Sequence, residues 1–435
     1  MIALDRELSA GAAVDGGGFG ALRLLAGPRG GTAEAWGQHR ERLGGPISEV
    51  LRGTAPGNLL GAIGGSGLRG RGGAGFPAAT KLAAALKRGV SGVVVVGNGS
   101  ETEPAAGKDD LLLRLRPHLV LDGLETVAVA TRAERSFLVV PSQAAWRSVT
   151  AALVDRPRHG PHGPKVELVL GPRNFVGGEE TALVSWLEGG PARPRYQRQR
   201  LVERGWRGRP TLVQNVETLA HLGLVARFGP EWFRSRGTAD EPGTMMVSLS
   251  GAVGRPGVYE VPIGIRISAL LEAAGAEPAA PALLVGGYFG SWLLPAQIAT
   301  AELSRRALAP LHASPGAGVL HLLAPGACGL REAHLVVDWM ARQSADQCGP
   351  CRLGLPALAG AMGELARPWA GGREVSDRIL RWSGQIVGRG ACRHPDGVVN
   401  LVRSTLLAFA DELEQHRRGH CGGGAPSTLP LPEPG

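Results

Sequence analysis

The chain has 435 residues, of which 43% are hydrophobic and 20% are charged, and its formal net charge is +9. This length allows two or three domains with a substantial core, and no apolar run is long enough to cross a membrane. The first twenty residues lack the features of a secretion signal, so we expect a cytoplasmic protein, free or on the cytoplasmic face of a membrane. The arginines are scattered and aromatic residues make up only 5%, so we expect no nucleic-acid partner.

The stretch Gly67–Pro77 is the most informative segment of the chain. Its glycines allow the backbone to reach positive φ and to approach a ligand closely, and consecutive amide groups in such a loop form an anion-binding concavity. Arg69 and Arg71 add bidentate phosphate donors. The stretch Ala78–Leu86, which contains Lys81, is compatible with a helix whose N-terminus also favours phosphate. The segment therefore predicts a phosphate-binding loop, with a flexible linker as the alternative.

Residues 56–240 alternate between strand-like and helix-like patterns, after a loosely ordered lead-in expected over residues 1–55. The apolar runs Gly92–Val96 and Val166–Leu170 predict buried strands, and Glu179–Leu187 predicts a helix. Strands that alternate with helices favour an α/β sheet that binds its ligand at the carboxyl ends of the strands.

Three polar corners lie where strands are expected to end or helices to begin. They are Asn98–Pro104, Gly177–Thr181 and Gln214–Thr218. The first contains Glu101 and Glu103, and two carboxylates in a loop are suited to bind ribose hydroxyls or to act as acid and base. A solvated loop is the alternative for the first corner, and helix capping is the alternative for the other two.

Two further domains are expected after residue 240. Residues 245–325 contain two strands with the turn-bearing stretch Ser250–Glu260, then a helix at Ile267–Ala274 and later strands, which together predict a small β-grasp domain. Residues 329–420 contain four amphipathic segments with short connections, which predict a four-helix bundle. The glycine- and proline-rich residues 421–435 predict a disordered tail.

The cysteines number five and all lie in the last quarter of the chain, which argues for a metal or redox module there rather than a disulfide framework. Cys348 and Cys351 form a Cys-x-x-Cys pair, and Cys392 follows between two expected helices. Such a set is compatible with a redox dithiol, a zinc ion or an iron–sulfur cluster, with buried unliganded cysteines as the alternative. The proline and arginine beside the pair favour a cluster.

In their order along residues 56–420, these motifs resemble the family of the NADH-binding FMN and iron–sulfur flavoprotein of respiratory complex I, its 51 kDa subunit, and the relatives of that protein in NAD-reducing hydrogenases and formate dehydrogenases. The resemblance implies a Rossmann-like FMN domain, a soluble-ligand-binding β-grasp domain and a four-helix bundle that holds a [4Fe-4S] cluster. It also implies NADH dehydrogenase activity, in which NADH gives a hydride to FMN and electrons pass singly through the cluster. The implied partner is a ferredoxin-like or 2Fe-2S protein subunit of a membrane-peripheral redox complex.

The functional positions of the family transfer to this chain residue by residue. Those implied to surround FMN are Gly70, Arg71, Gly72, Ala74, Lys81, Asn98, Glu101, Gly178, Glu179 and Asn215. Those implied to face the nicotinamide nucleotide, NAD(H) or NADP(H), are Phe76, Glu103 and Glu180, and those implied to bind iron are Cys348, Cys351 and Cys392. No side chain is implied to act as a catalytic acid or base.

The chain departs from the family pattern at two important places. Ala345 stands at the first cysteine of the cluster motif, which leaves the fourth bond to Asp346, to an external ligand or to none, and a three-iron or lost cluster as alternatives. Arg198–Leu201 replaces an aromatic segment of the nucleotide site, which favours either the phosphate of NADPH or a chain that no longer binds nicotinamide. The alternative function is a relative that keeps the fold and FMN but has lost NADH oxidation, acting as a scaffold or as a flavin relay fed by a partner protein.

Overall fold

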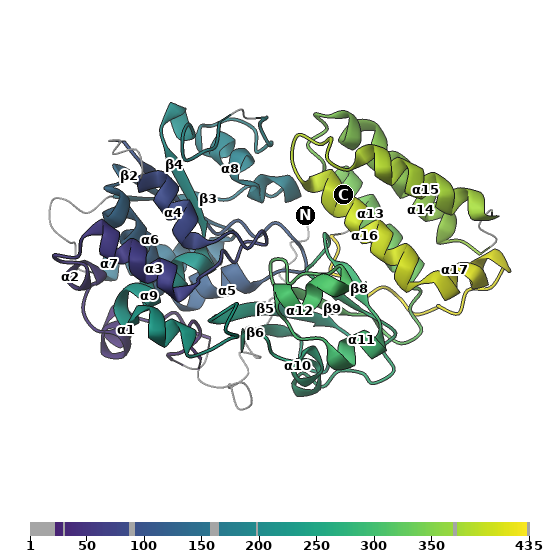
Figure 1. Cartoon of the computed structure of the whole chain (residues 1–435), viewed down its shortest axis with the longest axis horizontal. Helices are drawn as coiled ribbons and strands as arrows, with labels where there is room; N and C mark the ends of the chain where they lie inside the picture. The colour runs from purple at the N-terminus through teal and green to yellow at the C-terminus, as the bar shows by residue number, and fades with distance from the viewer. Residues whose placement is uncertain are drawn as a thin grey trace.

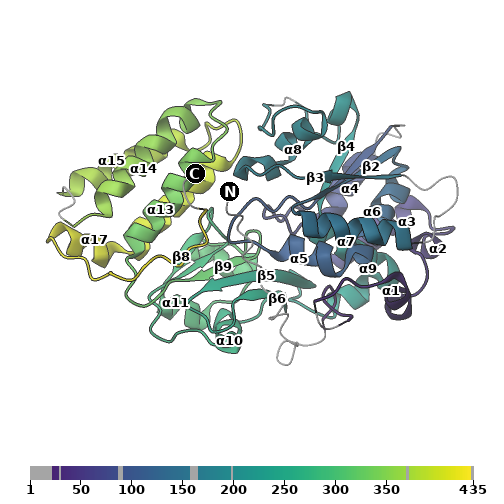
Figure 2. The same ribbon diagram turned by 180° about the vertical axis from the view of Figure 1, so that it is seen from behind.

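The computed structural model describes residues 22–28, 31–86, 92–156, 165–196, 199–368 and 372–432. Figures 1 and 2 show an α/β region formed by the first half of the chain, a β-sheet region in the middle, and a group of C-terminal helices. The middle region contacts both of the others. Its strand β5 (Thr244–Gly251) packs against helix α5 (Lys108–Leu115) of the first region, and its strand β8 (Ser291–Leu293) packs against helix α16 (His394–Ala408) of the last. The chain therefore has three parts in the order that the sequence predicts.

A four-stranded parallel sheet forms the centre of the α/β region, in the order β3-β2-β1-β4. Its strands are β1 (Val94–Asn98), β2 (Arg135–Val140), β3 (Val166–Leu170) and β4 (Thr211–Asn215). The β1 side chains Val94, Val95 and Val96 are fully buried, as expected for a strand covered on both faces. Because all four strands run in the same direction, their carboxyl ends meet at one edge of the sheet.

Helices lie before, between and after the parallel strands and cover the sheet. They are α3 (Pro56–Ser66), α4 (Ala78–Leu86), α5 (Lys108–Leu115), α6 (Pro117–Thr131), α7 (Gln143–Asp155), α8 (Glu180–Leu187) and α9 (Val216–Arg234), with the short turns η2 (Phe175–Gly178) and η3 (Trp206–Gly208). The predicted strands at 92–96 and 166–170 and the predicted helix at 179–187 are confirmed within a few residues. They could be predicted because each carries a continuous apolar run or a helical period of its own.

Helices α6 and α9 pack with their backbones in contact. Gly123 of α6 faces the Leu219 carbonyl of α9, and a Cβ added at Gly123 would overlap that carbonyl group. Gly223 of α9 faces the Gly123 backbone in turn, where an added Cβ would lie 3.1 Å from the amide nitrogen. The two glycines therefore allow an approach that no larger residue permits.

We expect Gly123→Ala to lower the free energy of unfolding by roughly 1–3 kcal/mol, because α6 and α9 must move apart to accept the methyl group. Gly61→Ala is the matched control, because Gly61 lies exposed in the interior of α3 and an added Cβ meets no described atom within 4 Å. This control should gain about 0.5–1 kcal/mol from helix propensity. Urea denaturation measures both variants, and equal stabilities would contradict the close packing of α6 and α9.

The N-terminal segment is held in place wherever the structure describes it, which corrects the prediction of a loose lead-in. It contains α1 (Trp36–Leu43) and α2 (Ile47–Val50), while residues 1–21 and 29–30 of the predicted lead-in lie outside the described residues. The Glu260 carboxylate accepts hydrogen bonds from the backbone N–H groups of residues 23–25. His39 is buried between Glu34 and Asp122, 3.2 Å and 2.9 Å away. Such long-range polar contacts produce no periodic pattern in the sequence.

The middle region is a five-stranded mixed sheet in the order β6-β5-β9-β7-β8. Its strands are β5 (Thr244–Gly251), β6 (Gly257–Pro262), β7 (Leu283–Val285), β8 (Ser291–Leu293) and β9 (Val319–Leu322). Its helices are α10 (Ile267–Ala273), α11 (Pro295–Thr300) and α12 (Arg305–Leu308), with the turn η4 (Ala309–Leu311). Strand β5 pairs antiparallel with β6 and parallel with β9. The predicted sequence of two strands, a helix and later strands is therefore present.

Packed helices form the C-terminal region, where α13 contacts α14 and α16, and α15 contacts α14 and α16. Their bounds are α13 (Gly329–Arg342), η5 (Pro350–Gly354), α14 (Leu355–Leu365), α15 (Gly372–Ile386), α16 (His394–Ala408) and α17 (Ala410–Arg417). The last predicted helix is interrupted at Phe409, whose buried ring fills the space beside Gly329. In the part of the chain that the structure describes, no helix is both long and apolar enough to span a bilayer.

The segment after α17 is packed rather than disordered over residues 421–432, which corrects the prediction for this part of the tail. Leu429 is buried against the core of the C-terminal helices, and the Ser427 hydroxyl donates to the Glu332 carboxylate at 2.6 Å. The glycine and proline content misled the prediction, because two long-range contacts are enough to anchor a segment with no regular structure. Residues 433–435 lie outside the described residues.

An aromatic cluster holds the three regions together. The ring of Phe175, from η2, makes edge contacts with Phe289 of the middle region at 5.1 Å and with Trp339 of α13 at 5.6 Å between ring centroids. His394, at the start of α16, lies 5.6 Å from Phe175 and 5.7 Å from Phe289. The strand ends of the first region and the cysteine loops of the last are thereby held beside one another.

Candidate functional site

The floor of the candidate site is the carboxyl edge of the parallel sheet. Asn98 and Asn215 end β1 and β4 and are paired in register, so they lie side by side. The Asn98 side-chain amide donates to the Gly178 carbonyl at 3.1 Å, which joins β1 to the turn before α8. Asn215 begins α9 by accepting a hydrogen bond from the Glu217 N–H at 3.0 Å. The corner Gln214–Thr218 therefore provides the N-cap of α9, as its capping alternative predicts.

The glycine-rich stretch lies over this edge as an anchored loop, so the linker alternative is excluded. Its two ends are joined by a hydrogen bond from the Gly70 N–H to the Phe76 carbonyl at 2.9 Å. The Arg71 N–H donates to the Thr218 hydroxyl at 2.8 Å, which fastens the loop to the first turn of α9. Gly73 has φ +104°, a conformation that favours glycine, and a Cβ added at Gly72 would lie 3.3 Å from the Asn215 Cβ.

Arg71 has a buried guanidinium beside the glycine loop, with hydrogen-bond donors left unpaired by the described residues. Its guanidinium is buried, and the Nε and Nη2 atoms have no hydrogen-bond partner among the described residues. The guanidinium has an ion-pair contact with the Glu217 carboxylate, whose Oε1 atom lies 3.9 Å from Nε. A buried guanidinium with free donors beside a glycine loop is a fitting environment for the phosphate of FMN.

A buried charge network supports the loop from below. Lys108 Nζ lies 2.9 Å from the Glu217 carboxylate and 2.7 Å from Asp109, and Asn215 donates to Asp109 at 2.7 Å. Burial lowers the pKa of Lys108, but the carboxylates of Asp109, Glu217 and Glu101 outweigh burial and the net result is a raised pKa. The residue assignment from sequence left out Lys108, Asp109 and Glu217, although each lies within a few residues of a predicted site residue in the quoted motifs.

Glu101 and Glu103 come from the loop after β1 and have different environments. The Glu101 carboxylate accepts hydrogen bonds from the backbone N–H groups of Asp109 and Asp110 at 3.0 and 2.9 Å. Burial, together with the neighbouring Asp109 carboxylate, raises the pKa of Glu101 to about 8. Glu103 accepts a hydrogen bond at 2.9 Å from the Tyr288 N–H of the middle region, and burial raises the pKa of Glu103 to about 7.

We expect Glu103→Gln to flatten the pH dependence of unfolding. The folded-state pKa of Glu103 lies near 7 and above its ordinary value of 4.5, so folding favours the protonated carboxyl. The stability linked to this group is present below pH 4.5 and is lost as the pH rises toward 7. Glu103→Gln should therefore gain up to about 3 kcal/mol relative to the unchanged protein between pH 5 and pH 8.

Urea denaturation of the flavin-free protein at both pH values measures this gain. The control Glu277→Gln changes an exposed carboxylate and should leave the pH dependence as it is. A Glu103→Gln variant with an unaltered pH dependence of unfolding would contradict the raised pKa of Glu103 in the folded protein.

The mouth of the site is formed by α4, the loop and the start of α8. Lys81 of α4 forms an ion pair with Glu180 of α8, and both side chains are partly exposed. Glu179 is the N-cap of α8 and accepts hydrogen bonds from the Thr181 and Ala182 N–H groups. The Phe76 side chain is 48% exposed beside them, which leaves an aromatic ring available to a ligand.

The middle region contributes a residue that the sequence did not single out. Arg305, at the start of α12, donates to the Gly73 carbonyl and lies against Gly75. Together with Gly70 and Arg71 it lines a narrow cavity on the inner side of the loop. No motif marks Arg305, because it approaches the loop from another region of the fold.

The structure brings most of the predicted nucleotide-site residues together. An ion pair joins Lys81 to Glu180, a hydrogen bond joins Asn98 to Gly178, and Asn215, beside which Gly72 lies, is paired in register with Asn98. Gly70, Arg71, Phe76, Glu101, Glu103 and Glu179 lie in the glycine loop, in the loop after β1 and at the start of α8. Ala74 is an exposed residue of the loop. Of the replaced aromatic segment, Leu201 is buried in the core beside the sheet and Arg200 is exposed, while Arg198 lies outside the described residues.

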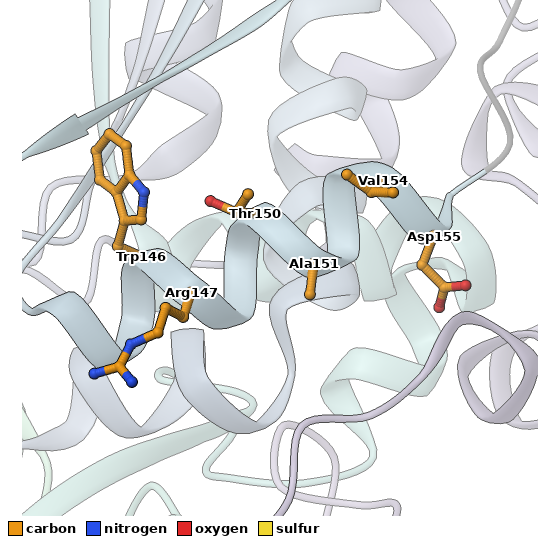
Figure 3. Close-up of a pocket in the computed structure, with 6 residues that line it drawn as sticks. All are labelled: Trp146, Arg147, Thr150, Ala151, Val154 and Asp155. Atoms are coloured by element: carbon orange, nitrogen blue, oxygen red, sulfur yellow. The ribbon is translucent and has the colours of Figure 1, made fainter.

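A separate depression on the surface does not belong to this site. Figure 3 shows its side chains along α7, and they are Trp146, Arg147, Thr150, Ala151, Val154 and Asp155. It is open to solvent, is lined by a single helix and contains none of the predicted site residues.

The predicted iron ligands converge from two loops of the C-terminal region. Burial raises the pKa of the Cys351 thiol to about 12, and the adjacent Cys348 and Cys392 thiols add to this rise. The nearby Ser344 hydroxyl lowers the pKa of the same thiol, against the effect of burial. Ala345 follows directly and is buried, with a relative exposure of 7%.

The cysteine site and the nucleotide site are neighbours. Burial raises the pKa of the Cys392 thiol, and the Glu179 carboxylate contributes to the same rise because it lies nearby. The Phe175 N–H, in the same turn η2 as Gly178, donates to the Gln343 side chain at 3.2 Å. The turn that carries Gly178 and Glu179 therefore links the end of β1 to the C-terminal region.

Comparisons with known proteins agree with this arrangement. Residues 63–223 match the family model of the Nuo51 FMN-binding domain, residues 246–283 match the SLBB domain, and residues 331–416 match the NADH-ubiquinone oxidoreductase-F iron-sulfur binding region. The F subunit of the NADH-quinone oxidoreductase of Mycobacterium tuberculosis is 32% identical over 390 residues, which cover 85% of this chain and 86% of the relative. The NADP-reducing hydrogenase subunit HndC of Solidesulfovibrio fructosivorans is 29% identical over 385 residues, which cover 85% of this chain and 78% of the relative.

Among solved structures, an NAD+-reducing [NiFe]-hydrogenase in the H2-reduced state matches with a TM-score of 0.80 and 30% identity. The match covers 86% of this chain and 65% of the hydrogenase chain, so this chain spans about two thirds of that relative. Shared sequence and shared fold thus extend over all three regions. The chain belongs to the NADH-quinone oxidoreductase F family, the family of the 51 kDa flavoprotein.

Proposed function

We propose that this chain is an FMN-dependent electron-transfer subunit that oxidises NADH or NADPH and passes the electrons through an iron–sulfur cluster to a ferredoxin-like or 2Fe-2S partner. The observation that carries the proposal is the adjacency of the two sites through the turn that holds Gly178 and Glu179. In finer terms, the α/β region is proposed to be the Rossmann-like FMN domain, the middle region a β-grasp domain and the C-terminal helices a four-helix bundle. The proposed location is the cytoplasm or the cytoplasmic face of a redox complex.

FMN, when bound, supplies the chemistry that accepts a hydride and releases single electrons. The residues proposed to surround it are Gly70, Arg71, Gly72, Ala74, Lys81, Asn98, Glu101, Gly178, Glu179 and Asn215. Arg71 offers a buried positive charge with free donors, and Lys81 adds a second charge at the mouth. Both are suited to neutralise phosphate groups.

Phe76, Glu103 and Glu180 are proposed to contact the nicotinamide nucleotide. The exposed Phe76 ring offers a stacking surface. Glu180 is paired with Lys81 in this structure, so a nucleotide that uses either side chain must first separate the pair. The raised pKa of Glu103 keeps part of this carboxyl protonated near neutral pH, which reduces its repulsion of an anionic nucleotide.

Cys348, Cys351 and Cys392 are proposed to hold the cluster through three thiolates, because Ala345 offers no ligand atom. The donor set fits a cluster that lacks one protein thiolate, either a three-iron cluster or a [4Fe-4S] cluster with a fourth ligand from outside the chain. Asp346 does not supply this bond in the present arrangement, because its carboxylate is exposed and lies 3.8 Å from Arg352.

A flavin relay that is fed by a partner protein, or a scaffold that keeps FMN, is the second candidate. The closed Lys81–Glu180 pair and the replacement of the aromatic segment around Arg200 favour it, because both reduce the surface that a nicotinamide nucleotide would use.

Anaerobic purification with flavin, iron and sulfide assays, followed by titration with NADH and NADPH, separates the candidates. Loss of the flavin absorbance with either nucleotide supports nucleotide oxidation, and flavin that responds to neither supports the relay. Protein without flavin or iron after reconstitution would overturn both. Cys351→Ser is the matched variant, since it should keep the flavin response to nucleotide while losing iron and reduction of a ferredoxin acceptor.

A further inference from the structure

A second group of metal-binding side chains lies apart from the predicted iron ligands. It consists of Cys328, His416 and Cys421, whose ligand atoms all lie within 4.8 Å of one another. Cys328 precedes α13, His416 is in the last turn of α17, and Cys421 follows that helix. The sequence separation of Cys328 from the other two, and the absence of a Cys-x-x-Cys spacing, explain why no motif revealed the group.

The spacing of the atoms matches a tetrahedral ion. Cys328 Sγ is 3.6 Å from His416 Nε2. Bond lengths of about 2.3 Å from zinc to sulfur and about 2.05 Å from zinc to nitrogen, at a tetrahedral angle, place these two atoms about 3.6 Å apart. Cys328 and His416 therefore need little movement to share one ion, and the Cys421 sulfur lies within 4.8 Å of both ligand atoms.

The orientation of the histidine is already that of a metal ligand. His416 Nδ1 lies 2.8 Å from the Leu365 carbonyl, which can only accept a hydrogen bond, so Nδ1 carries the proton. The unprotonated Nε2 then directs its lone pair toward Cys328 Sγ. A backbone carbonyl that fixes the ring in this way is the usual support for a zinc-bound histidine. His416 and Cys328 are buried, with 1% and 3% exposure, which keeps them in one arrangement.

The charge balance selects a divalent cation. Two cysteine thiolates and a neutral imidazole carry two negative charges, which one divalent ion neutralises. The Cys328 sulfur also accepts a hydrogen bond from the Arg331 N–H at 3.4 Å, at the N-terminus of a 14-residue helix whose dipole favours negative charge. Thiolate and imidazole ligands together favour zinc over magnesium or calcium.

The group of ligands is open to solvent at Cys421 and closely packed at Cys328. Cys421 is exposed, so the group of ligands is open to solvent on that side. Gly423 packs against Cys328 so closely that an added Cβ would lie 2.5 Å from its backbone nitrogen. The Ala425 N–H donates to the Gly326 carbonyl at 3.0 Å, which holds the tail beside α13.

We propose that Cys328, His416 and Cys421 bind a structural zinc ion that fastens the chain after α17 to the start of α13. The site is separate from the cysteines proposed to hold the iron–sulfur cluster, because Cys328 precedes α13 whereas Cys348 and Cys351 follow its other end. It does not depend on the proposed redox function, since a zinc ion at this place has no part in electron transfer.

The test measures zinc and iron together in the purified full-length protein by mass spectrometry of the elements. We expect about one zinc per chain, and at least about tenfold less in Cys328→Ser, His416→Gln and Cys421→Ser. Serine at position 328 keeps a side-chain acceptor for the Arg331 N–H, so this variant should still fold. His420→Gln is the matched control on an exposed neighbour and should keep its zinc.

The metal content of Cys351→Ser and the absorption of cobalt-substituted protein distinguish the zinc site from the iron site. Cys351→Ser should retain zinc while losing iron, and cobalt substituted for zinc should show thiolate absorption in Cys351→Ser but not in Cys421→Ser. A zinc-free protein with a Cys328–Cys421 disulfide in non-reducing mass spectrometry would overturn the proposal. Zinc that disappears with Cys351 rather than with Cys421 would overturn it as well, by placing the ion in the iron site.

Discussion

Arg71→Gln is expected to weaken FMN binding at least about 100-fold. The Arg71 guanidinium is buried, and two of its nitrogens have no partner among the described residues, so it is ready to donate to a phosphate without competition from water. Glutamine keeps part of the volume but removes the charge, and a buried charged partner is commonly worth about 3–5 kcal/mol. Titration of flavin-free protein with FMN, followed by the quenching of flavin fluorescence, measures the loss.

Arg69→Gln is the matched control for this loop. Arg69 Nη1 donates to the Gly75 carbonyl at 3.0 Å, so its guanidinium holds the loop rather than the ligand. Loss of one such hydrogen bond costs roughly 0.5–1.5 kcal/mol, which corresponds to a change in affinity of about tenfold or less. Circular dichroism of both flavin-free variants checks that they fold. Equal FMN affinities for Arg71→Gln and the unchanged protein would remove Arg71 from the phosphate site.

Ala345→Cys is expected to raise the iron content from about three to about four per chain, by adding a fourth thiolate to the cluster. Ala345 is buried and lies three residues before Cys348, so a sulfur atom at position 345 would lie near the other ligands. Asp346 has φ +52°, a left-handed turn that bends the chain between position 345 and Cys348. Iron analysis and electron paramagnetic resonance of anaerobically purified protein measure the change.

Ala345→Ser is the control, because it adds a side chain of similar size without a thiolate. It should keep the iron content and the three-iron signal of the unchanged protein. If the unchanged protein already contains four irons and shows no three-iron signal, the fourth iron is held by a ligand from outside the chain, and the expected gain will be absent. Loss of iron in both variants would show that position 345 packs against the cluster loops rather than facing the metal.

The elements with a strong local pattern were predictable from sequence. The apolar run of β1, the helix that begins at Glu180 and the glycine loop all lie where the sequence places them. The site residues in these segments were also predictable, because strand ends, helix caps and glycine turns are local features of the backbone. Asn215 shows this well, since the residue that ends β4 is also the N-cap of α9.

The residues that sequence analysis missed all act across the fold. Lys108 and Glu217 meet beneath the glycine loop, and Arg305 reaches the loop from the middle region. Lys108 and Glu217 belong to or lie close to the motifs, but only the fold shows that they meet, and no motif marks Arg305. The described parts of the N-terminal lead-in and of the tail were mispredicted for the same reason, because polar contacts such as those of Glu260 and Ser427 hold segments without periodicity.

The sequence by itself determined the order of the three regions, the glycine loop, the strand-end polar residues and the Cys348–Cys351 pair with Cys392. These features depend on backbone conformation and side-chain type within a few residues, and such requirements are visible in local sequence. Only the tertiary structure decided that Arg71 is a buried cation with free donors, that Lys81 closes on Glu180, and that Cys328 meets His416 and Cys421. Burial and proximity between distant residues arise from packing of the whole chain, which leaves no local pattern to read.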